Sequence, residues 1–590
     1  MLLVTIVVIK EINFLTELKT KTMIPAAFII LWLTMSENVE KFDDSGSISQ
    51  ATNSESAAMD TLYRKVRRAL KCGLFSTVLR QDIDSLDEFM IANGRSLAER
   101  DEVSYLKVKS MLAEAYDYFG VINSSDELRA EGAKVFDQLK VVDVVHPNDR
   151  QINRERIRFC LNHANAFFYR EYKFDLAKER VLWCRDFITE RLREEQCFPC
   201  HGTLAQAEFY LGNIYRRLNQ YSQAEECFVR AIGFYYERAK RKKDEYGTDP
   251  SKFEILQEDL AFSRYKLAIC LGIGMGWVSF TKGNLREAIH HNILPARVLL
   301  MGTEDRLHTA YLDLLFNAAT RSADGRRGMN LSAAIENITR AYEVFREHKH
   351  IHHAGNALLE LSLAYFYNDN LLEAQAILAR LEMELRGADE SRWRCPRLLI
   401  ASRIRQRLGD YIEADRLVSH ALVYASETKQ IPYHIEALIV RSETSILLGR
   451  MDSARADLSR ALELNVDGKG QSNPKVEAIC YLHLARSYAL DHNGRDAERY
   501  FARWKQLEQR VEHGVIRQMA RDIEKEIECL RRDFVIRADT DNLSYGDHLK
   551  ALQRFLVNQA MQRGQTIQEA TKTLKISRQT LHQWQKEKGR

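Results

Sequence analysis

The chain contains few of the residues that interrupt helices. Its 590 residues include only 8 Pro and 27 Gly. Because Pro and Gly destabilise helix interiors, a long chain with so few of them favours helices over sheets. The length is also too great for one compact core, so we expect several domains or a repeat array. The sequence therefore predicts an all-α protein.

An excess of one charge and a framework of paired cysteines are also missing. The 86 Lys and Arg nearly balance the 82 Asp and Glu, for a net charge of +4. A nucleic-acid-binding function therefore needs a local basic segment. Most of the ten cysteines stand singly in helical stretches such as Arg158–Cys160, which is typical of buried thiols in a reducing compartment. We expect a cytoplasmic protein without disulfides.

Long apolar runs are absent as well. The runs MLLVTIVVI and MIPAAFIILWL near the start have 9 and 11 residues, whereas a membrane-spanning helix needs roughly 20. A targeting signal and a membrane anchor are the alternatives, but we favour translation from Met35 and no membrane partner. Residues 1–58 are then a doubtful apolar start followed by a polar, Ser-rich leader that stays disordered.

Motifs for catalysis and cofactors are not found. The sequence has no Gly-rich phosphate loop, nucleophile elbow or His-Glu-x-x-His run, so we expect no enzyme and no cofactor. Cys197-Phe-Pro-Cys200-His201 matches haem-attachment and redox patterns without their contexts, and it leaves zinc one ligand short. We interpret it as an inter-helix loop. The histidines of EHKHIHH, residues 347–353, are interpreted as a solvated loop, with weak metal binding as the alternative.

Internal repetition is the strongest positive signal. In AEFYLGNIYRRLNQYSQAEECFVRAI, Gly212, Tyr215, Ala224, Phe228 and Ala231 have the spacing of a tetratricopeptide repeat, and the segment resembles that family. Small residues let two antiparallel helices approach, while the aromatic residues fill the space between repeats. The resemblance implies a solenoid of helix pairs.

The same frame recurs along the chain, and its anchor is a small residue that opens each second helix. We assign this role to eight alanines: Ala177, Ala224, Ala288, Ala334, Ala374, Ala414, Ala454 and Ala497. Their steps of 47, 64, 46, 40, 40, 40 and 43 residues exceed the repeat's usual length of about 34, so helices or loops must be longer. The longest step contains KRKKDEYGTDP, which we interpret as an exposed insertion.

These observations divide the chain into five parts. After residues 1–58 we expect an N-terminal helical cap or divergent repeats at 59–150, and the solenoid at 151–537. A linker at 538–546 precedes a separate C-terminal domain at 547–590. The solenoid resembles the sensor halves of bacterial regulators, and such a groove holds a protein, a peptide or a small ligand.

The last segment has its own helix signals and its own charge. Thr566 and Glu569 form a capping box at the start of one helix, and Ser577 caps the next. Residues 548–590 contain nine Lys and Arg against two Glu, a net charge of +7. A capped helix that is apolar behind and donor-rich in front suits the DNA major groove.

The segment resembles the C-terminal helix-turn-helix of Fis-type regulators, with departures at Lys575 and Trp584. That resemblance and the outward positions give the expected DNA-binding residues: Thr566, Lys572, Lys575, Ser577, Arg578, Gln579, Thr580, His582, Gln583 and Lys586. We therefore expect a DNA-binding transcription regulator whose repeat array senses a partner. A homodimer would supply paired half-sites. The alternative is a scaffold for protein assembly, with the last helices as a solenoid cap.

Overall fold

The computed structural model describes parts of residues 61–168 and most of residues 173–540. The gaps in the second range are 192–197, 248, 250, 252, 302–304, 325–330, 349, 385–390 and 468. The predictions for residues 1–58, including a start at Met35, and for the helix-turn-helix at 547–590 fall outside the described residues.

Helices make up the described part of the chain, which contains no strand beyond one isolated bridge between Val466 and Ser472. Two seven-residue stretches, η5 and η6, are wound as π-helices. The elements up to the middle of the chain are α4 (Thr77–Arg100), α8 (Phe174–Arg191), α9 (Phe198–Arg217), α10 (Tyr221–Tyr246), α11 (Phe253–Ala268), η5 (Ile269–Met275), α12 (Gly276–Lys282), η6 (Glu287–Ile293), α13 (Leu294–Leu300) and α14 (Arg306–Asp324).

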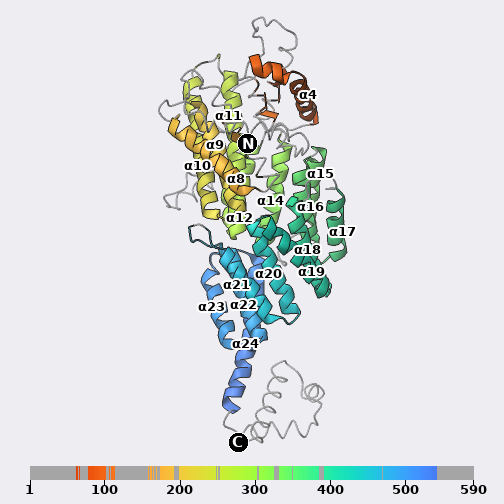
Figure 1. Cartoon of the computed structure of the whole chain (residues 1–590). Coiled ribbons are helices and arrows are strands. Elements are labelled where there is room, and N and C mark those ends of the chain that lie inside the picture. Colours follow the sequence, from red (N-terminus) through yellow and green to blue (C-terminus); the bar gives the residue numbers. More distant parts are fainter. Residues whose placement is uncertain are drawn as a thin grey trace, which may run out of the picture. The chain divides into compact units, whose positions relative to one another are not determined.

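The later elements are shorter and more regular. They are α15 (Leu331–Glu347), α16 (Ile351–Tyr367), α17 (Leu371–Glu384), α18 (Ser391–Arg407), α19 (Tyr411–Glu427), α20 (Ile431–Leu447), α21 (Met451–Leu464), α22 (Pro474–Leu490), α23 (Gly494–Leu507) and α24 (Gly514–Thr540). Neighbouring helices α14 to α19 lie side by side as antiparallel pairs (Figure 1). The all-α repeat array expected from the sequence is confirmed.

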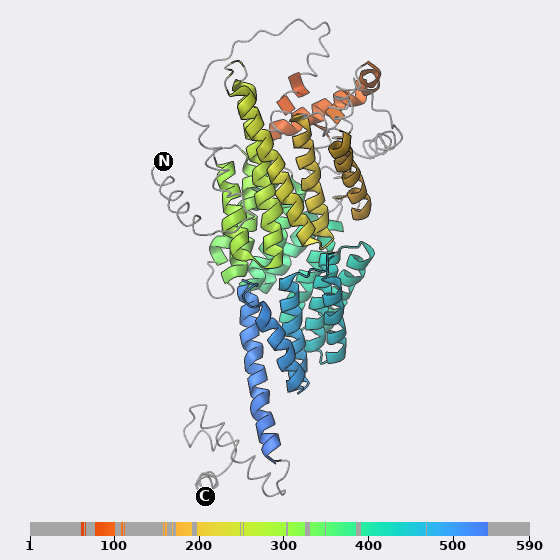
Figure 2. The ribbon, with the colours of Figure 1, turned by 90° about the vertical axis from the view of Figure 1, so that its left-hand side faces the viewer.

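The chain forms two compact units. The first contains Met1–Cys480 and Leu507–Ile516, and the second contains Tyr481–Gln506 and Arg517–Arg590. The long helix α24, blue in Figure 2, has residues in both. In the described part of the second unit, the rings of Tyr488 and Tyr500 stack with centroids 5.5 Å apart. None of the described helices is both long and apolar enough to cross a membrane.

The anchor alanines predicted from the sequence open the second helix of each pair. All eight are buried, and the most exposed of them, Ala334, keeps only 5% of its surface. Ala224, Ala374, Ala414 and Ala454 each stand in the first turn of their helices. A methyl group at this position lets the two helices of a pair approach, because a larger side chain would hold their backbones apart. The repeat frame is therefore confirmed.

Each described turn between the paired helices has a left-handed residue five positions before the anchor. These residues are Asn219, Gly283, Asp369, Gly409, Gly449 and His492, and their φ angles lie between 57° and 86°. The following residue donates its N–H to a carbonyl five residues earlier, as Arg450 does to Ser445 at 2.8 Å. This Schellman-type closure ends the first helix and reverses the chain.

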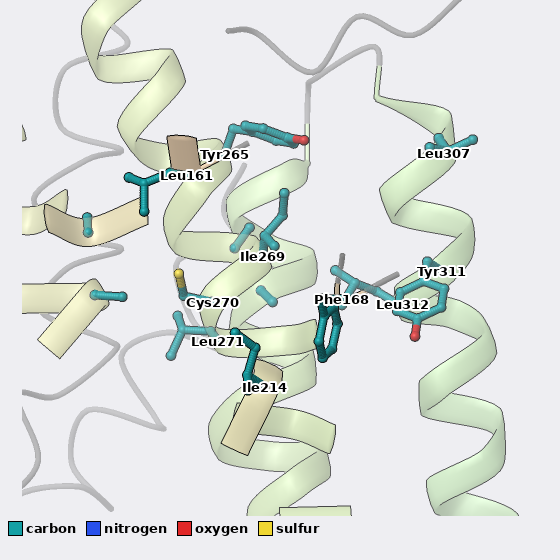
Figure 3. Close-up of a cluster of buried hydrophobic side chains, with 14 of the residues drawn as sticks. Leu161, Phe168, Ile214, Tyr265, Ile269, Cys270, Leu271, Leu307, Tyr311 and Leu312 are labelled. Carbon is teal, nitrogen blue, oxygen red and sulfur yellow. The ribbon is translucent and has the colours of Figure 1, made fainter. Parts of the chain in front are cut away.

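Small residues also shape the core of the first unit. An added Cβ at Gly272 would stand 2.2 Å from Leu312 Cδ2, and one at Gly212 would stand 2.7 Å from the Phe228 ring. Leu312 belongs to the apolar cluster shown in Figure 3, together with Ile269, Leu271 and other side chains. Six cysteines are free and buried, as expected: Cys160, Cys184, Cys227, Cys270, Cys395 and Cys480.

Three local interpretations need correction. The charged segment read as an insertion is helical as far as Tyr246, because Lys242 packs over the Tyr246 ring and donates to its hydroxyl at 2.8 Å. The expected loop at 197–201 is the first turn of α9 from Phe198 onward, where Pro199 fits because the first N–H groups of a helix need no partner inside it. Helix α24 continues to Thr540, into the expected linker.

Candidate partner-binding surface

The first helices of neighbouring pairs pack directly against one another. Helix α14 contacts α16, α16 contacts α18, and α18 contacts α20. The second helices α17 and α19 pack mainly on the first helices beside them. Because the first helices lie closer together than the second, the stack bends toward them. The first helices therefore line the inner surface of the array, which is the surface that helical-repeat proteins use for partners.

The first unit also folds back on itself, so that residues far apart in sequence touch. The N–H of Glu512 donates to the Gly283 carbonyl at 3.1 Å, and its carboxylate accepts from the Arg286 N–H at 2.7 Å. The Asn473 side chain donates to the Thr281 carbonyl at 3.2 Å. We call these contacts, between residues 280–286 and residues 473–475 and 511–513, the closing seam.

A second set of contacts extends the closure toward α10. Asn219 donates to the Leu464 carbonyl at 3.4 Å, Ser222 donates to Gln471, and Lys469 pairs with Glu226. Asp175 and Lys429 lie 3.6 Å apart. These polar contacts join α8, α10 and the turn before α10 to the α20–α21 pair and to the loops on either side of it. These contacts consequently join helices of the first unit that are far apart in the sequence.

Charged side chains of alternating sign line this inner surface. Five successive first helices each supply one of them, in the order Arg321, Glu360, Arg403, Glu436 and Lys475. Arg321 Nη2 lies 2.5 Å from Glu360 Oε2, and Arg403 Nη1 lies 3.1 Å from Glu436 Oε1. Each ion pair thus bridges two neighbouring repeats.

The two arginines of these ion pairs differ in exposure. The Arg321 side chain is 8% exposed and that of Arg403 is 26% exposed. Burial opposes the charge of Arg403, but Glu436 and Glu443 outweigh it, so the pKa of this guanidinium lies above its usual value. Arg321 also lies over the Tyr367 ring, 5.5 Å from its centroid. Both pairs are therefore fixed, partly desolvated elements of the surface.

Lys475 is the unpaired member of the series. Its ammonium lies 5.2 Å from the centroid of the Phe280 ring and forms no ion pair with any residue in the described part of the chain. Burial lowers its pKa, Glu436 and Glu360 raise it, and Arg403 lowers it, with a net decrease. The inner surface thus holds a partly desolvated cation without a carboxylate in contact.

His513 lies beside Lys475 at the closing seam. It is 8% exposed, and its Nδ1 accepts or donates no hydrogen bond within the described residues. Burial, then Lys475 and then Arg321 lower the pKa of its imidazole well below the usual value. Lys475 and Arg321 are the two ends of the alternating series, and both act on His513. The seam therefore brings the two cationic ends of the series to one place.

The histidines at 348–353 do not form the solvated loop expected from the sequence. His348 and His350 are 7% and 5% exposed. His350 caps α16 by accepting from the His353 N–H at 3.2 Å, and the two rings stack with centroids 4.0 Å apart. Tyr311 stacks on the other side of His353 at 4.3 Å. The prediction is wrong because α16 begins directly at Ile351, which turns these rings onto α14.

The residues expected to bind DNA lie outside the described part of the chain. They are Thr566, Lys572, Lys575, Ser577, Arg578, Gln579, Thr580, His582, Gln583 and Lys586. Their role stays a prediction. Within the described residues, no group of three or more His, Cys, Asp or Glu is arranged to hold a metal ion.

Sequence reasoning did not find the charged residues of the inner surface. Their distances from the anchor alanines differ from one repeat to the next, so no periodic pattern marks them. Arg321 stands near the end of its first helix, whereas Lys475 stands at the start. Only the curvature of the array brings them together.

Comparison with known proteins agrees with the repeat assignment. Residues 209–237 match the tetratricopeptide repeat. Among curated proteins, none matches the chain. The array is thus a tetratricopeptide-like helical-repeat protein, an architecture suited to protein–protein interaction.

Several solved structures resemble the chain at low identity. One is a Rap protein complexed with Competence and Sporulation Factor, with 14% identity over 64% of this chain and 99% of that chain and a TM-score of 0.39. Another is aspartyl phosphate phosphatase F from Bacillus subtilis, with 13% identity over 80% of this chain and 98% of that chain and a TM-score of 0.36. Yeast Tom70 has 14% identity over 82% of this chain and 98% of that chain, with a TM-score of 0.37.

Proposed function

We propose that this protein is a DNA-binding regulator whose repeat array holds a protein or peptide partner. The observation that carries the partner-holding part is the inner surface, where the Lys475 ammonium has no carboxylate in contact within the described residues. A side chain in that environment is stabilised by a ligand of opposite charge. The proposal includes no catalytic step and no cofactor.

The DNA-binding part of the proposal comes from the composition of residues 548–590. Their net charge of +7 exceeds that of the whole chain, +4, and supplies the electrostatic footprint that a DNA phosphate backbone requires. We expect Arg578, Thr580, Gln583 and Lys586, which follow the Ser577 cap, to form the reading face. Arg and Gln read guanine and adenine edges in the major groove.

The two parts would be coupled by a shift of conformational populations. A partner that binds the closed array more tightly than an opened one stabilises the closed form by the difference in binding free energy. In the sequence, helix α24 follows the seam segment and precedes the tail. Partner binding would then change the availability of the tail for DNA, and DNA would change partner affinity reciprocally.

The test uses the full chain and a pool of random double-stranded DNA. We expect several rounds of selection to enrich a defined sequence, with binding that weakens steeply as salt rises. Arg578→Ala should lower affinity for the enriched sequence by about 10- to 100-fold, the range for one bidentate base contact. The control is Arg563→Ala, a charge-matched change in the same segment but outside the expected reading face.

Two results would contradict the DNA-binding proposal. One is a selected pool that stays random. The other is an equal loss for Arg578→Ala and Arg563→Ala, which indicates charge without sequence recognition. With either result, the scaffold alternative would become the better account, since it needs the array but not the tail.

A further inference from the structure

In the alternating series of charges on the inner surface, one cation has no carboxylate partner. Along the five first helices the signs run plus, minus, plus, minus, plus, from Arg321 to Lys475. Two of the three cations have a carboxylate partner, Glu360 for Arg321 and Glu436 for Arg403. In an array that does not close on itself, a cation at the end of the series would need no partner. The closing seam, however, brings the last cation back toward the first.

The seam fixes Lys475 on both sides. Its own N–H donates to Asn473 Oδ1 at 3.0 Å, and the Asn473 side chain is tied to the Thr281 carbonyl. An added Cβ at Gly283 would stand 3.3 Å from Lys475 Cβ and 3.4 Å from Val511 Cγ1. Lys475 and the segment before α24 therefore share one wall, formed by the turn after α12. His513 is the last residue of that segment.

Both cations act on the imidazole of His513 and, with burial, lower its pKa. His513 is buried, and its Nδ1 has no hydrogen-bond partner within the described residues. A buried polar nitrogen without a partner is unfavourable, so the site is incomplete as it stands. A bound carboxylate would accept from the Lys475 ammonium and from an imidazole N–H. It would also be the anion missing between Lys475 and Arg321.

From this arrangement we propose that the inner surface binds an acidic peptide and places one of its carboxylates between Lys475, His513 and Arg321. This inference rests on the proposed partner-holding function of the array and names the partner's chemistry. The peptide is favoured over a free anion by the surroundings. Glu360 and Glu436 act on Lys475 and repel any anion, so binding needs contacts beyond charge. A peptide adds backbone and apolar contacts, for which the Phe280 and Tyr367 rings beside the cations are suited.

Binding should change the titration of His513. The two cations and burial hold its pKa down, so a carboxylate placed beside it must raise that pKa. We would follow the Cε1–H signal of His513 by NMR in the full-length protein with ¹³C-labelled histidine. The probe is an N-acetylated, C-amidated peptide of alternating Glu and Leu, which carries side-chain carboxylates only. The matched probe replaces every Glu by Gln.

The expected result is a higher pKa for His513 with the Glu peptide and no change with the Gln peptide. The Glu peptide should also bind about tenfold or more tightly, as expected for one charge-assisted contact out of water. Lys475→Met should raise the pKa of His513 in the free protein and remove the preference for the Glu peptide. Lys240→Met, at an exposed position on α10, should change neither value. An unchanged melting temperature shows that each variant is folded.

Three outcomes would overturn the inference. The first is equal binding of the two peptides, in which case the array holds peptides without this anion site and the partner-holding function stands. The second is no binding of either peptide, which excludes an acidic peptide as the partner. The third is a pKa change with inorganic phosphate as large as that with the Glu peptide, which identifies a free-anion site. The DNA selection does not depend on any of these results.

Discussion

Gly355 lies against the indole of Trp393, where an added Cβ would stand 2.5 Å from Nε1. Trp393 is 1% exposed and cannot move aside. Gly409 is a different case, because nothing lies within 4 Å of an added Cβ but its φ is +80°. The first glycine is required by packing and the second by backbone conformation.

Substitutions at these two glycines should separate the two requirements. Gly355→Ala gains helix propensity but overpacks the core, so we expect a net loss of about 1–3 kcal/mol in unfolding free energy. Gly409→Ala should cost about 1 kcal/mol from the left-handed backbone. Asn tolerates that conformation, so Gly409→Asn should be nearly neutral while Gly355→Asn is worse than Ala. Urea unfolding measures all four, and equal effects of Asn at both positions would contradict this explanation.

The titration of His513 should make stability depend on pH. Its pKa is lowered in the folded protein by burial, Lys475 and Arg321, so between that value and about 6.5 the unfolded chain binds more protons. The free energy of unfolding should therefore fall as the pH drops below about 6.5. His201, His348 and His434 have lowered pKa values and add to the same trend.

Two variants isolate the contribution of His513. His513→Gln should show a smaller loss of stability between pH 7.5 and 5.5 than the unchanged protein, because Gln does not titrate. His290→Gln, the same replacement at an exposed position, is the control. If His513→Gln behaves like the control, the imidazole is not in the field of the two cations.

At the scale of the helices, the capping side chains differ between equivalent turns. Asp410 accepts the N–H of Glu413 at 3.2 Å and caps α19, whereas Gln220 at the same position before α10 makes no side-chain cap. Asp410→Ala should therefore cost about 1 kcal/mol and Gln220→Asp should gain up to about 1 kcal/mol. Thermal unfolding of the two variants checks both signs, and a loss for Gln220→Asp would show that the turn does not admit the cap.

The same scale explains what could be predicted from the sequence. The anchor alanines and the left-handed residues before them recur because helix packing and chain reversal are local requirements. The anchor alanines predicted the repeat frame correctly, whereas the left-handed residues were found only in the structure. The histidines at 348–353 were misjudged because a polar cluster near a helix start has the same composition whether it is exposed or stacked. Only Tyr311, from the preceding pair, decides between the two.

At the scale of the whole first unit, the closing seam could not be predicted. It consists of single polar contacts between turns, such as Asn473 with Thr281 and Glu512 with Gly283. Such residues are ordinary turn residues in the sequence, and nothing in their spacing pairs them. The candidate site depends on the contacts of the seam. Because those contacts could not be predicted from the sequence, the site could not be predicted either. The DNA-binding prediction for 547–590 rests on sequence alone.

The contacts of the seam should differ in their energetic weight. Asn473 is 4% exposed and donates to the Thr281 carbonyl, so Asn473→Ala should cost about 1–3 kcal/mol by leaving that carbonyl without its partner. Lys469 and Glu226 have side chains that are 43% and 52% exposed, and a double-mutant cycle should give a coupling of less than about 1 kcal/mol. If the coupling energy of Lys469 and Glu226 exceeds the loss of unfolding free energy in Asn473→Ala, the exposed pair is the stronger contact and this explanation is contradicted.

The most direct test of the account is amide hydrogen exchange at Glu512. This residue lies between α23 and α24, outside both helices, and its N–H donates to the Gly283 carbonyl across the seam. If the array closes on itself, the Glu512 amide should exchange far more slowly than a free amide, and Asn473→Ala should speed its exchange. Exchange of Glu512 at the rate of an unstructured peptide would show that the seam is open. The closed array, and the anion site built on it, would then be contradicted.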